Sequence, residues 1–246
     1  MTVFAAVLDR LLRTDSGRPL VTFYDEATGE RVELSVATYA NWVAKVSSLL
    51  LDELDLARGD TLRVDLPVHW LTPVLLGAAW NGGLVVSDTD TPDAVVTGPD
   101  GLARWDGYGG GPVVATALAP LGVRFREPLP AGVLDLGVEV WSQPDSFRPW
   151  DPPSDEDPAV ALAGLRLTQA QLWEATAGVL PQTHGGRLLS VANPASPPGL
   201  ASFTEPLATG GSVVLVSHAD PGRLETIAAV ERVTDRFGTA RFEGPD

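Results

Sequence analysis

The residues whose types and spacing could carry chemistry begin with a histidine. His69 and Trp70 follow Pro67, which ends a predicted strand over Thr61–Leu66. Doubly wound sheets bind ligands at the carboxyl ends of their strands, and a neutral imidazole can donate to a ligand or accept from one. We therefore predict His69 and Trp70 as ligand-binding residues. The alternative is a histidine that is exposed or satisfied within the core.

Metal and nucleophile chemistry have little support in the sequence. Asp88 and Asp90 have the D-x-D spacing of a metal pair, but the same spacing is common in turns. His184 and His218 form no H-x-x-x-H pair, and the chain has no cysteine, which rules out thiolate zinc sites, disulfides and cysteine nucleophiles. No G-x-S-x-G string is present to build a serine-hydrolase elbow. We expect no catalytic residue, no metal and no cofactor.

The sequence also offers few residues that could bind a phosphate. The only glycine-rich run, Gly107–Pro112, leads into a strand, whereas a phosphate cradle leads from a strand into a helix. We therefore predict a flexible loop there. Lys45 is the only lysine of the chain. The acids within Asp151–Asp157 are expected to be solvated charges, because a catalytic carboxylate pair needs a cleft that separates its two pKa values.

Composition limits the partners and the setting. The 246 residues carry a net charge of −15, so the field of the molecule repels nucleic acid and anionic membranes. No apolar run approaches the roughly 20 residues of a membrane helix. The amino-terminal residues predict an amphipathic helix, not a secretion signal. We expect a cytoplasmic protein with no nucleic-acid or membrane partner.

Strand and helix patterns alternate along the first part of the chain. A hairpin is predicted over Val21–Tyr24 and Arg31–Leu34, and Ser35 then caps a helix. Thr72 is expected to cap a second helix, which Asn81-Gly82 closes. The further predicted strands are Thr61–Leu66, Leu84–Ser87, Asp93–Thr97 and Pro112–Ala117. This alternation is typical of βαβ units and a largely parallel sheet.

The pattern stops at a segment rich in proline and acid, Gln143–Pro158, and then resumes. We therefore predict a first lobe at 1–143, a linker at 144–158 and a second lobe at 159–246. The elements expected in the second lobe are a capping box at Thr168 and Gln171 that starts a helix running to Leu180, a strand at Leu188–Val191, a helix at Gly199–Thr209, a strand at Ser212–Ser217 and a helix at Asp220–Arg236.

Four of the chain's seven tryptophans also have expected places. Trp42 and Trp80 lie on predicted buried helix faces and are expected in the core. Trp141 and Trp150 flank the linker, so they are candidates for packing the two lobes together. An apolar ligand groove between the lobes stays open as a possibility, because such interfaces are common pocket sites.

Three segments of the chain resemble adenylate-forming enzymes, the superfamily of acyl-CoA synthetases and AMP-dependent ligases. They are LVTFYDEATGERVELSVATYANWVAKVSSLL (20–50), GDTLRVDLPVHWLTPVLLGAAWNGGLVVSD (59–88) and the stretch from Arg187 to Thr234. The chain is most similar to short actinobacterial proteins known only by their likeness to acyl-CoA synthetases. The resemblance implies a two-lobed, three-layer α/β/α fold with largely parallel sheets, like a truncated amino-terminal domain of the superfamily.

The resemblance breaks where ATP would bind. In the superfamily a strand after the linker runs into a glycine-rich loop ending in lysine, whose backbone amides cradle the phosphates. Here Ala159 to Leu172 leave no room for that loop, and the later adenine, ribose and lysine motifs do not follow before Asp246. We expect a catalytically degenerate member that serves as a binding or interaction module. Two alternatives remain, a subunit of a split adenylate-forming enzyme and a sensor or carrier of an acyl or nucleotide ligand.

A truncated parallel sheet would expose an edge of unpaired amides and carbonyls, which a second subunit can cover. We therefore expect a homodimer, and a small acyl ligand or a protein as a further partner.

Overall fold

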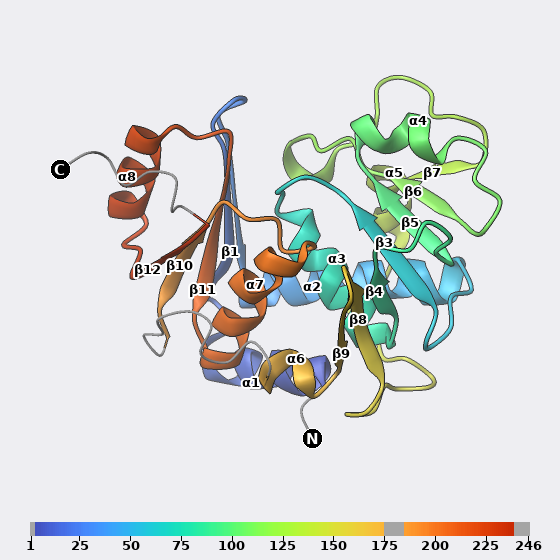
Figure 1. Ribbon diagram of the computed structural model, residues 1–246, viewed down its shortest axis with the longest axis horizontal. Coiled ribbons are helices and arrows are strands. Elements are labelled where there is room, and N and C mark those ends of the chain that lie inside the picture. Colours follow the sequence, from blue (N-terminus) through green and yellow to red (C-terminus); the bar gives the residue numbers. More distant parts are fainter. Residues whose placement is uncertain (1–2, 175–184, 239–246) are drawn as a thin grey trace.

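Two largely parallel sheets organise the chain in a computed structural model that describes residues 3–174 and 185–238 (Figure 1). The first sheet consists, in spatial order, of β12 (Asp235–Phe237), β10 (Arg187–Ser190), β11 (Ser212–Ser217), β1 (Pro19–Asp25) and β2 (Glu30–Ser35). The second consists of β7 (Val133–Asp135), β6 (Val113–Ala115), β5 (Ala94–Thr97), β3 (Thr61–Asp65), β4 (Val85–Ser87), β8 (Pro158–Leu162) and β9 (Leu165–Thr168). Only the β1–β2 and β8–β9 pairs are antiparallel among these described strands.

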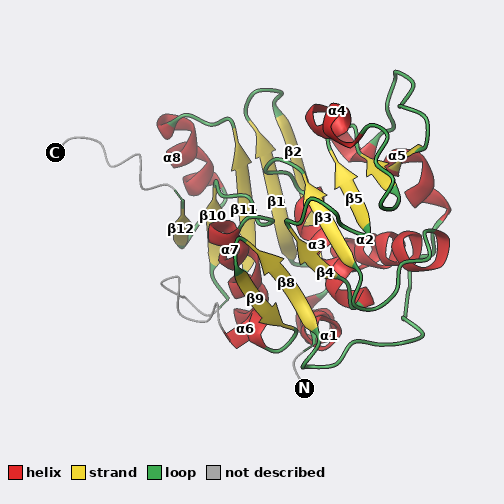
Figure 2. Cartoon of the chain, turned by 45° about the vertical axis from the view of Figure 1, so that its right-hand side comes forward, coloured by secondary structure: helices red, strands yellow, loops and turns green. Residues whose placement is uncertain are grey.

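Helices fill the space between the sheets and cover their outer faces (Figures 1 and 2). Those between the sheets are α1 (Phe4–Asp15), α2 (Val36–Ser48), α3 (Leu71–Gly82) and α7 (Pro197–Thr209). The outer helices are α8 (Pro221–Val230) on the first sheet and α4 (Leu102–Trp105) on the second, and the short α5 (Leu136–Glu139) and α6 (Gln171–Glu174) follow β7 and β9. Each sheet thus has helices on both faces, which confirms the predicted α/β/α class.

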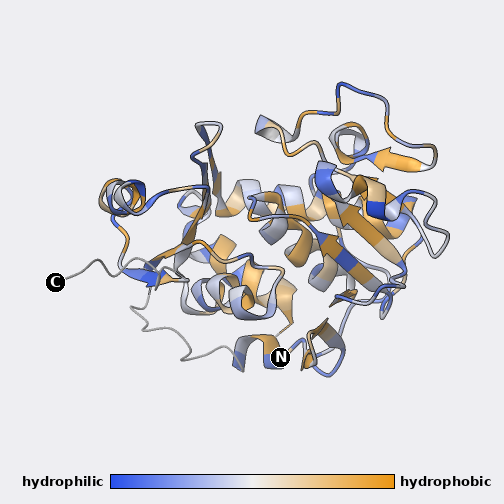
Figure 3. Ribbon diagram, turned by 45° about the horizontal axis from the view of Figure 1, so that its top comes forward, coloured by the Kyte–Doolittle hydropathy of each residue, from blue (hydrophilic) through white to orange (hydrophobic). Residues whose placement is uncertain are grey.

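The centre of the core is α3, which is apolar on all sides and buried along its length. A helix of that kind must be enclosed by other elements. Gly77 lets α2 approach α3 closely, because a Cβ on Gly77 would lie 2.2 Å from the hydroxyl oxygen of Tyr39 on α2. That hydroxyl donates to the carbonyl of Pro73, 3.0 Å away. In Figure 3 the strands of the second sheet are coloured as largely hydrophobic.

Most of the predicted elements form, with one helix end misplaced. Ser35 caps α2 by accepting from the backbone N–H of Thr38. Thr168 and Gln171 exchange the two hydrogen bonds of a capping box, and the rest of that predicted helix, to Leu180, lies outside the described residues. The helix predicted over Asp220–Arg236 was wrong in its second half. It ends at Val230, and residues 235–237 instead form β12, because the chain turns back to pair with β10.

In both sheets, strands that precede the predicted linker in the sequence pair with strands that follow it. The amino-terminal hairpin joins the first sheet, where β1 lies beside β11, and the β8–β9 hairpin joins the second sheet beside β4. Two tryptophans also depart from expectation. Trp150 is 99% exposed and packs no lobe against the other, and Trp42 is only partly buried. Trp80 is fully buried, as predicted.

Candidate functional site

A group of buried polar side chains lies where the two sheets approach each other at the ends of β1 and β3. Phe23 of β1 contacts the ring of His69, which follows β3, with ring centroids 4.9 Å apart. The loop after β10 reaches the same place, because the Asn193 side-chain amide donates to the Leu66 carbonyl at 2.7 Å. Three segments far apart in the sequence therefore meet at this junction.

His69 is 3% exposed and held in one tautomer when neutral. Its Nδ1 accepts from the backbone N–H of Leu71 at 3.2 Å, so the ring proton of the neutral form is on Nε2. Burial lowers the pKa of His69 to about 4, and the charge of Asp25 opposes this only in part. The Nε2 atom is buried and has no hydrogen-bond partner among the described residues. His69 is thus a neutral N–H donor near pH 7.

Trp70 contributes a second donor of the same kind. It is 1% exposed, and its ring lies between those of His69 and Trp42, at 5.5 and 5.0 Å. Its Nε1 is also buried and forms no hydrogen bond of good geometry among the described residues, although the N–H lies near enough to Glu30 to act on the pKa of that carboxyl. Trp70, and not Thr72, occupies the N-cap of α3; the Thr72 hydroxyl donates to the Pro67 carbonyl instead, which corrects the predicted cap.

Two carboxylates complete the junction. Asp25 and Glu30 are directly opposed in the β1–β2 register. Burial raises the pKa of Glu30, as does the charge of Asp25, while the nearby Trp70 N–H lowers it in part. Glu30 Oε1 is nevertheless buried without a partner in hydrogen-bonding geometry. Among the described residues five buried side-chain polar atoms lack a partner, and three of them belong to Glu30, His69 and Trp70, so the unmet hydrogen-bonding capacity is concentrated here.

Asp25 has a different environment from Glu30. Burial pushes its pKa up, but hydrogen bonds from His218, Ala27 and Thr28 outweigh burial and hold the pKa below its ordinary value. The His218 Nδ1 lies 2.7 Å from the Asp25 carboxylate, and His218 has a positive φ of 60° at the end of β11. Asp25 is therefore an ionised, well-bonded carboxylate beside one whose charge is disfavoured.

The sequence prediction named His69 and Trp70 but missed Glu30 and Asp25. Their partnership depends on the hairpin joining the first sheet while His69 follows a strand of the second. The available signal was local only: a carboxylate on each side of the β1–β2 turn, where two like charges face each other.

The D-x-D pair has a structural role. The Asp88 carboxylate accepts from the backbone N–H of Ala163 at 2.7 Å, and Asp90 forms ion pairs with Arg104 and Arg63. No group of three or more His, Asp or Glu side chains among the described residues could hold a metal ion. His184 lies outside the described residues.

The Asp88 contact fixes the turn between β8 and β9, where the sequence resemblance would place a phosphate loop. Strands β8 and β9 are joined by two residues, Ala163 and Gly164, because Leu162 pairs with Leu165. Both turn residues have positive φ, 45° and 84°, which is the pattern of a tight type I′ hairpin. A hairpin this short has no loop that could surround a phosphate, and the Ala163 amide already has an acceptor.

The single lysine is also committed to a structural contact. Lys45 Nζ donates to the Gln143 carbonyl at 2.5 Å and pairs with Asp145 at 3.1 Å, so it ties α2 to the segment between α5 and β8. In that segment Asp151 and Asp157 pair with Arg58. Asp151 is 74% exposed, as expected of a solvated charge, but the Asp157 side chain is only 15% exposed, so the prediction was wrong for Asp157.

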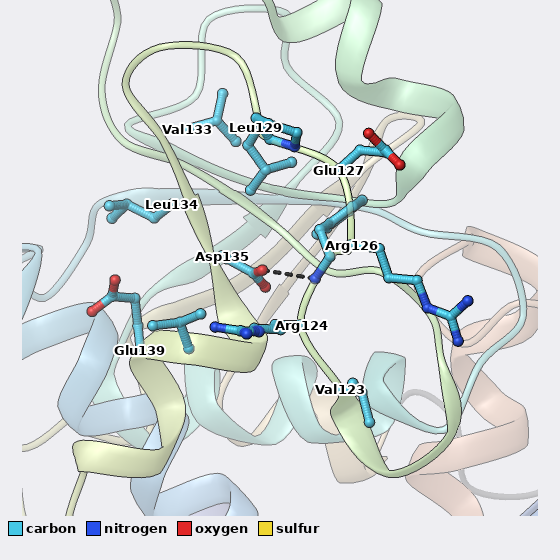
Figure 4. Close-up of a pocket in the computed structure, with 12 residues that line it drawn as sticks. Val123, Arg124, Arg126, Glu127, Leu129, Val133, Leu134, Asp135 and Glu139 are labelled. Atoms are coloured by element: carbon cyan, nitrogen blue, oxygen red, sulfur yellow. Dashed lines mark hydrogen bonds between the residues drawn. The ribbon is translucent and has the colours of Figure 1, made fainter.

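A separate hollow of about 690 Å³ lies around the loop between β6 and β7 (Figure 4). Asp135 organises it, because its two carboxylate oxygens accept from the backbone N–H groups of Phe125 and Gly137. Arg124 and Glu139 lie along its wall, so charges of both signs line the same hollow. Arg124, Arg126 and Glu127 are exposed, and Asp135 and Glu139 are only partly buried, so the hollow is a weaker candidate than the buried junction.

The fold is that of the amino-terminal part of adenylate-forming enzymes. The chain is similar to an acyl-CoA synthetase of Brucella canis (TM-score 0.79, 18% identity, 95% of this chain and 46% of that one). It is similar to a benzoate CoA ligase of Burkholderia xenovorans (TM-score 0.71, 17% identity, 94% and 48%). It also resembles the N-terminal domain of FACL13 from Mycobacterium tuberculosis (TM-score 0.70, 13% identity, 95% and 62%). The chain thus spans about half to three-fifths of these solved structures, which confirms the predicted fold resemblance.

One curated protein gives the family. It is a TIGR03089 family protein of Mycobacterium tuberculosis, 37% identical over 240 residues that cover 95% of this chain and 97% of that protein. The chain belongs to this TIGR03089 family, and the predicted likeness to actinobacterial proteins is confirmed. No family model matches the chain. Within the described residues, no helix has the length and apolar character needed to cross a membrane.

Proposed function

We propose that this chain is a non-adenylating member of the fold, which binds a ligand at the junction of Glu30, His69 and Trp70. The β8–β9 turn carries the first half of the proposal. Adenylate formation needs positioned donors around the phosphates, and the hairpin offers two residues with one amide already bonded to Asp88. Lys45 supports the same conclusion, because its ammonium group is engaged with Gln143 and Asp145.

The buried donors support the binding half of the proposal. A polar atom that is buried without a partner costs about 1–3 kcal/mol. The Trp70 N–H acts on the Glu30 carboxyl without forming a hydrogen bond of good geometry, so these two atoms and His69 Nε2 would be stabilised by a ligand or water that bonds to them. His69 and Trp70 each offer a neutral N–H, and Glu30 offers an acceptor. Neutral donors suit a carbonyl or carboxyl oxygen. Polyphosphate is disfavoured by the Asp25 carboxylate and by the net charge of −15. We therefore propose an acyl compound as the ligand class.

Thermal unfolding with acyl compounds tests this function. Fatty acids of increasing length are added separately to the wild type, and a ligand at a hundred times its dissociation constant adds about 2.7 kcal/mol of stability. At least one acyl compound is expected to raise the melting temperature. Trp70→Phe removes the indole N–H, and the shorter side chain of His69→Asn withdraws the donor from the position of the ring Nε2. Both variants should lose that rise, whereas Trp141→Phe, an exposed tryptophan, should keep it.

Three other results would contradict parts of the proposed function. A rise that persists in both junction variants would place the ligand elsewhere. ATP–pyrophosphate exchange by the purified chain with a carboxylic acid would refute the non-adenylating half. Exchange that appears only with a co-purifying protein would favour the split-enzyme alternative.

A further inference from the structure

The polar side chains of the junction are linked to one another through Trp70 and Asp25. The Trp70 ring lies 5.5 Å from the ring of His69, and its indole N–H acts on the Glu30 carboxyl. The Asp25 charge acts on both His69 and Glu30. The unsatisfied atoms of His69, Trp70 and Glu30 thus belong to one cluster, to which a single small head group can bond.

These three atoms offer two kinds of hydrogen bond. His69 Nε2 and Trp70 Nε1 are neutral donors, whereas an ionised Glu30 has only acceptor oxygens. A ligand group that satisfies all three must contain an acceptor oxygen and a donor hydrogen side by side. A primary carboxamide has both, and a carboxylic acid has both only while it keeps its proton. An ester or a thioester has no donor and would leave Glu30 unsatisfied.

The charges around Glu30 disfavour a carboxylate ligand. Asp25 is ionised and directly opposed to Glu30 in the β1–β2 register. The other titratable groups are His69, which is neutral near pH 7, and His218, whose Nδ1 is bonded to Asp25. The short helix Pro120–Gly122, which also packs on β2, has no titratable side chain. A ligand carboxylate would add a third negative charge, and carboxylates held this close must share a proton.

Apolar surface lies directly beside these polar atoms. The rings of Trp42, Trp70, His69 and Phe23 follow one another, with centroids 5.0, 5.5 and 4.9 Å apart. This aromatic row begins at Trp42, which is partly exposed, and ends at Phe23, which is 2% exposed. Ligand sites commonly combine a few polar groups with such apolar walls, so the row suits an apolar chain on the same ligand.

We propose that the junction binds a primary carboxamide with an apolar chain, and that Glu30 selects it over the corresponding carboxylate. The carbonyl oxygen accepts from His69 and Trp70, and the amide N–H donates to Glu30. A carboxylic acid binds in the same place only by taking up one proton, which it shares with Glu30. This ligand class rests on the proposed function, in which the junction binds an acyl compound.

Isothermal titration calorimetry of the full chain with octanamide, octanoic acid and methyl octanoate tests the selection. At pH 8 octanamide should bind roughly tenfold more tightly than either of the other two compounds, because each of these leaves Glu30 without a donor. The affinity for octanoate should fall by about tenfold per pH unit between pH 7 and pH 9, because its binding takes up one proton. The affinity for octanamide should stay constant over the same range.

Glu30→Gln tests the selecting residue directly. The glutamine amide can donate to a carboxylate, so octanoate should bind this variant roughly tenfold more tightly than the wild type at pH 8, and the pH slope should vanish. A residue that only supported the fold would not change the slope. Glu33→Gln is the matched control and should keep the wild-type preference, because Glu33 lies on the same strand but is exposed and paired with Arg31.

The results that would overturn this selection differ from those that would refute the proposed function. Octanoate that binds as tightly at pH 9 as at pH 7 would overturn the selection alone. A slope that persists in Glu30→Gln would do the same, because it would assign the proton to another group. If none of the three compounds binds the wild type, or if Trp70→Phe binds them equally well, the proposed function itself is refuted, and the selection with it.

Discussion

At the scale of single residues, the junction combines a neutral imidazole with two unlike carboxylates. His69 has its pKa lowered to about 4 by burial, whereas an unfolded histidine titrates near 6.5. Between these two values the unfolded state binds more protons than the native state. The free energy of unfolding therefore falls as pH drops through this window, and His69 contributes no such loss above pH 6.5.

This linkage gives a pH prediction for His69→Asn. Asparagine can still accept from the Leu71 amide but does not titrate, so the variant lacks the loss of stability that His69 causes. Relative to the variant, the wild type should lose roughly 3 kcal/mol between pH 7 and pH 4. Urea unfolding of both proteins at the two pH values measures the difference. Parallel stability curves would mean that His69 is not buried as a neutral ring.

Glu30→Gln should raise stability at pH 7. Burial and the Asp25 charge raise the pKa of Glu30, so the native state disfavours the ionised carboxylate that is present at pH 7. The penalty is absent below the unfolded pKa and develops as pH rises through the native pKa. The melting temperature of Glu30→Gln should therefore exceed that of the wild type at pH 7, and the gain should shrink near pH 4. A lower melting temperature at pH 7 would show that the Glu30 charge is well satisfied.

The sequence could locate only part of this junction. His69 and Trp70 were identifiable because Pro67 ends a strand and the carboxyl end of a strand is a common ligand position. Glu30 was not, because its contact with Trp70 depends on how the two sheets approach each other. No periodicity within either segment encodes that distance.

At the scale of elements, the β8–β9 hairpin is the informative one. Ala163 has a φ of 45°, a conformation that costs alanine but suits asparagine, and Asn-Gly is the favoured pair for a type I′ turn. Ala163→Asn should therefore stabilise the chain by roughly 0.5–1 kcal/mol. Chemical denaturation measures the change. Gly164→Ala, at a φ of 84°, is the matched control and should destabilise it.

The element boundaries show where local patterns suffice. Ser35 and the Thr168–Gln171 capping box were predictable because a cap is made within four residues. The end of α8 was not, because Glu231 turns back to bond Tyr24, Arg31 and Arg187. Arg187 and Glu231 lie far apart in the sequence, so spacing at three residues could not reveal that the helix ends at Val230.

At the scale of the whole molecule, two hairpins connect parts of the chain that the sequence pattern separates. The proline-rich segment looked like a boundary, but β1–β2 joins the later strands and β8–β9 joins the earlier ones. Class and strand direction were predictable from the alternation of strands and helices. Sheet membership was not, because alternation does not say which strand lies at which edge.

The central claim is that the hairpin at Ala163–Gly164 replaces the phosphate site. The most direct test is thermal unfolding of the wild type with ATP at millimolar concentration, with and without magnesium. The melting temperature is expected to stay unchanged. A saturable, magnesium-dependent rise would contradict the claim; at a hundred times the dissociation constant it would amount to roughly 5–10 °C for a chain of this length.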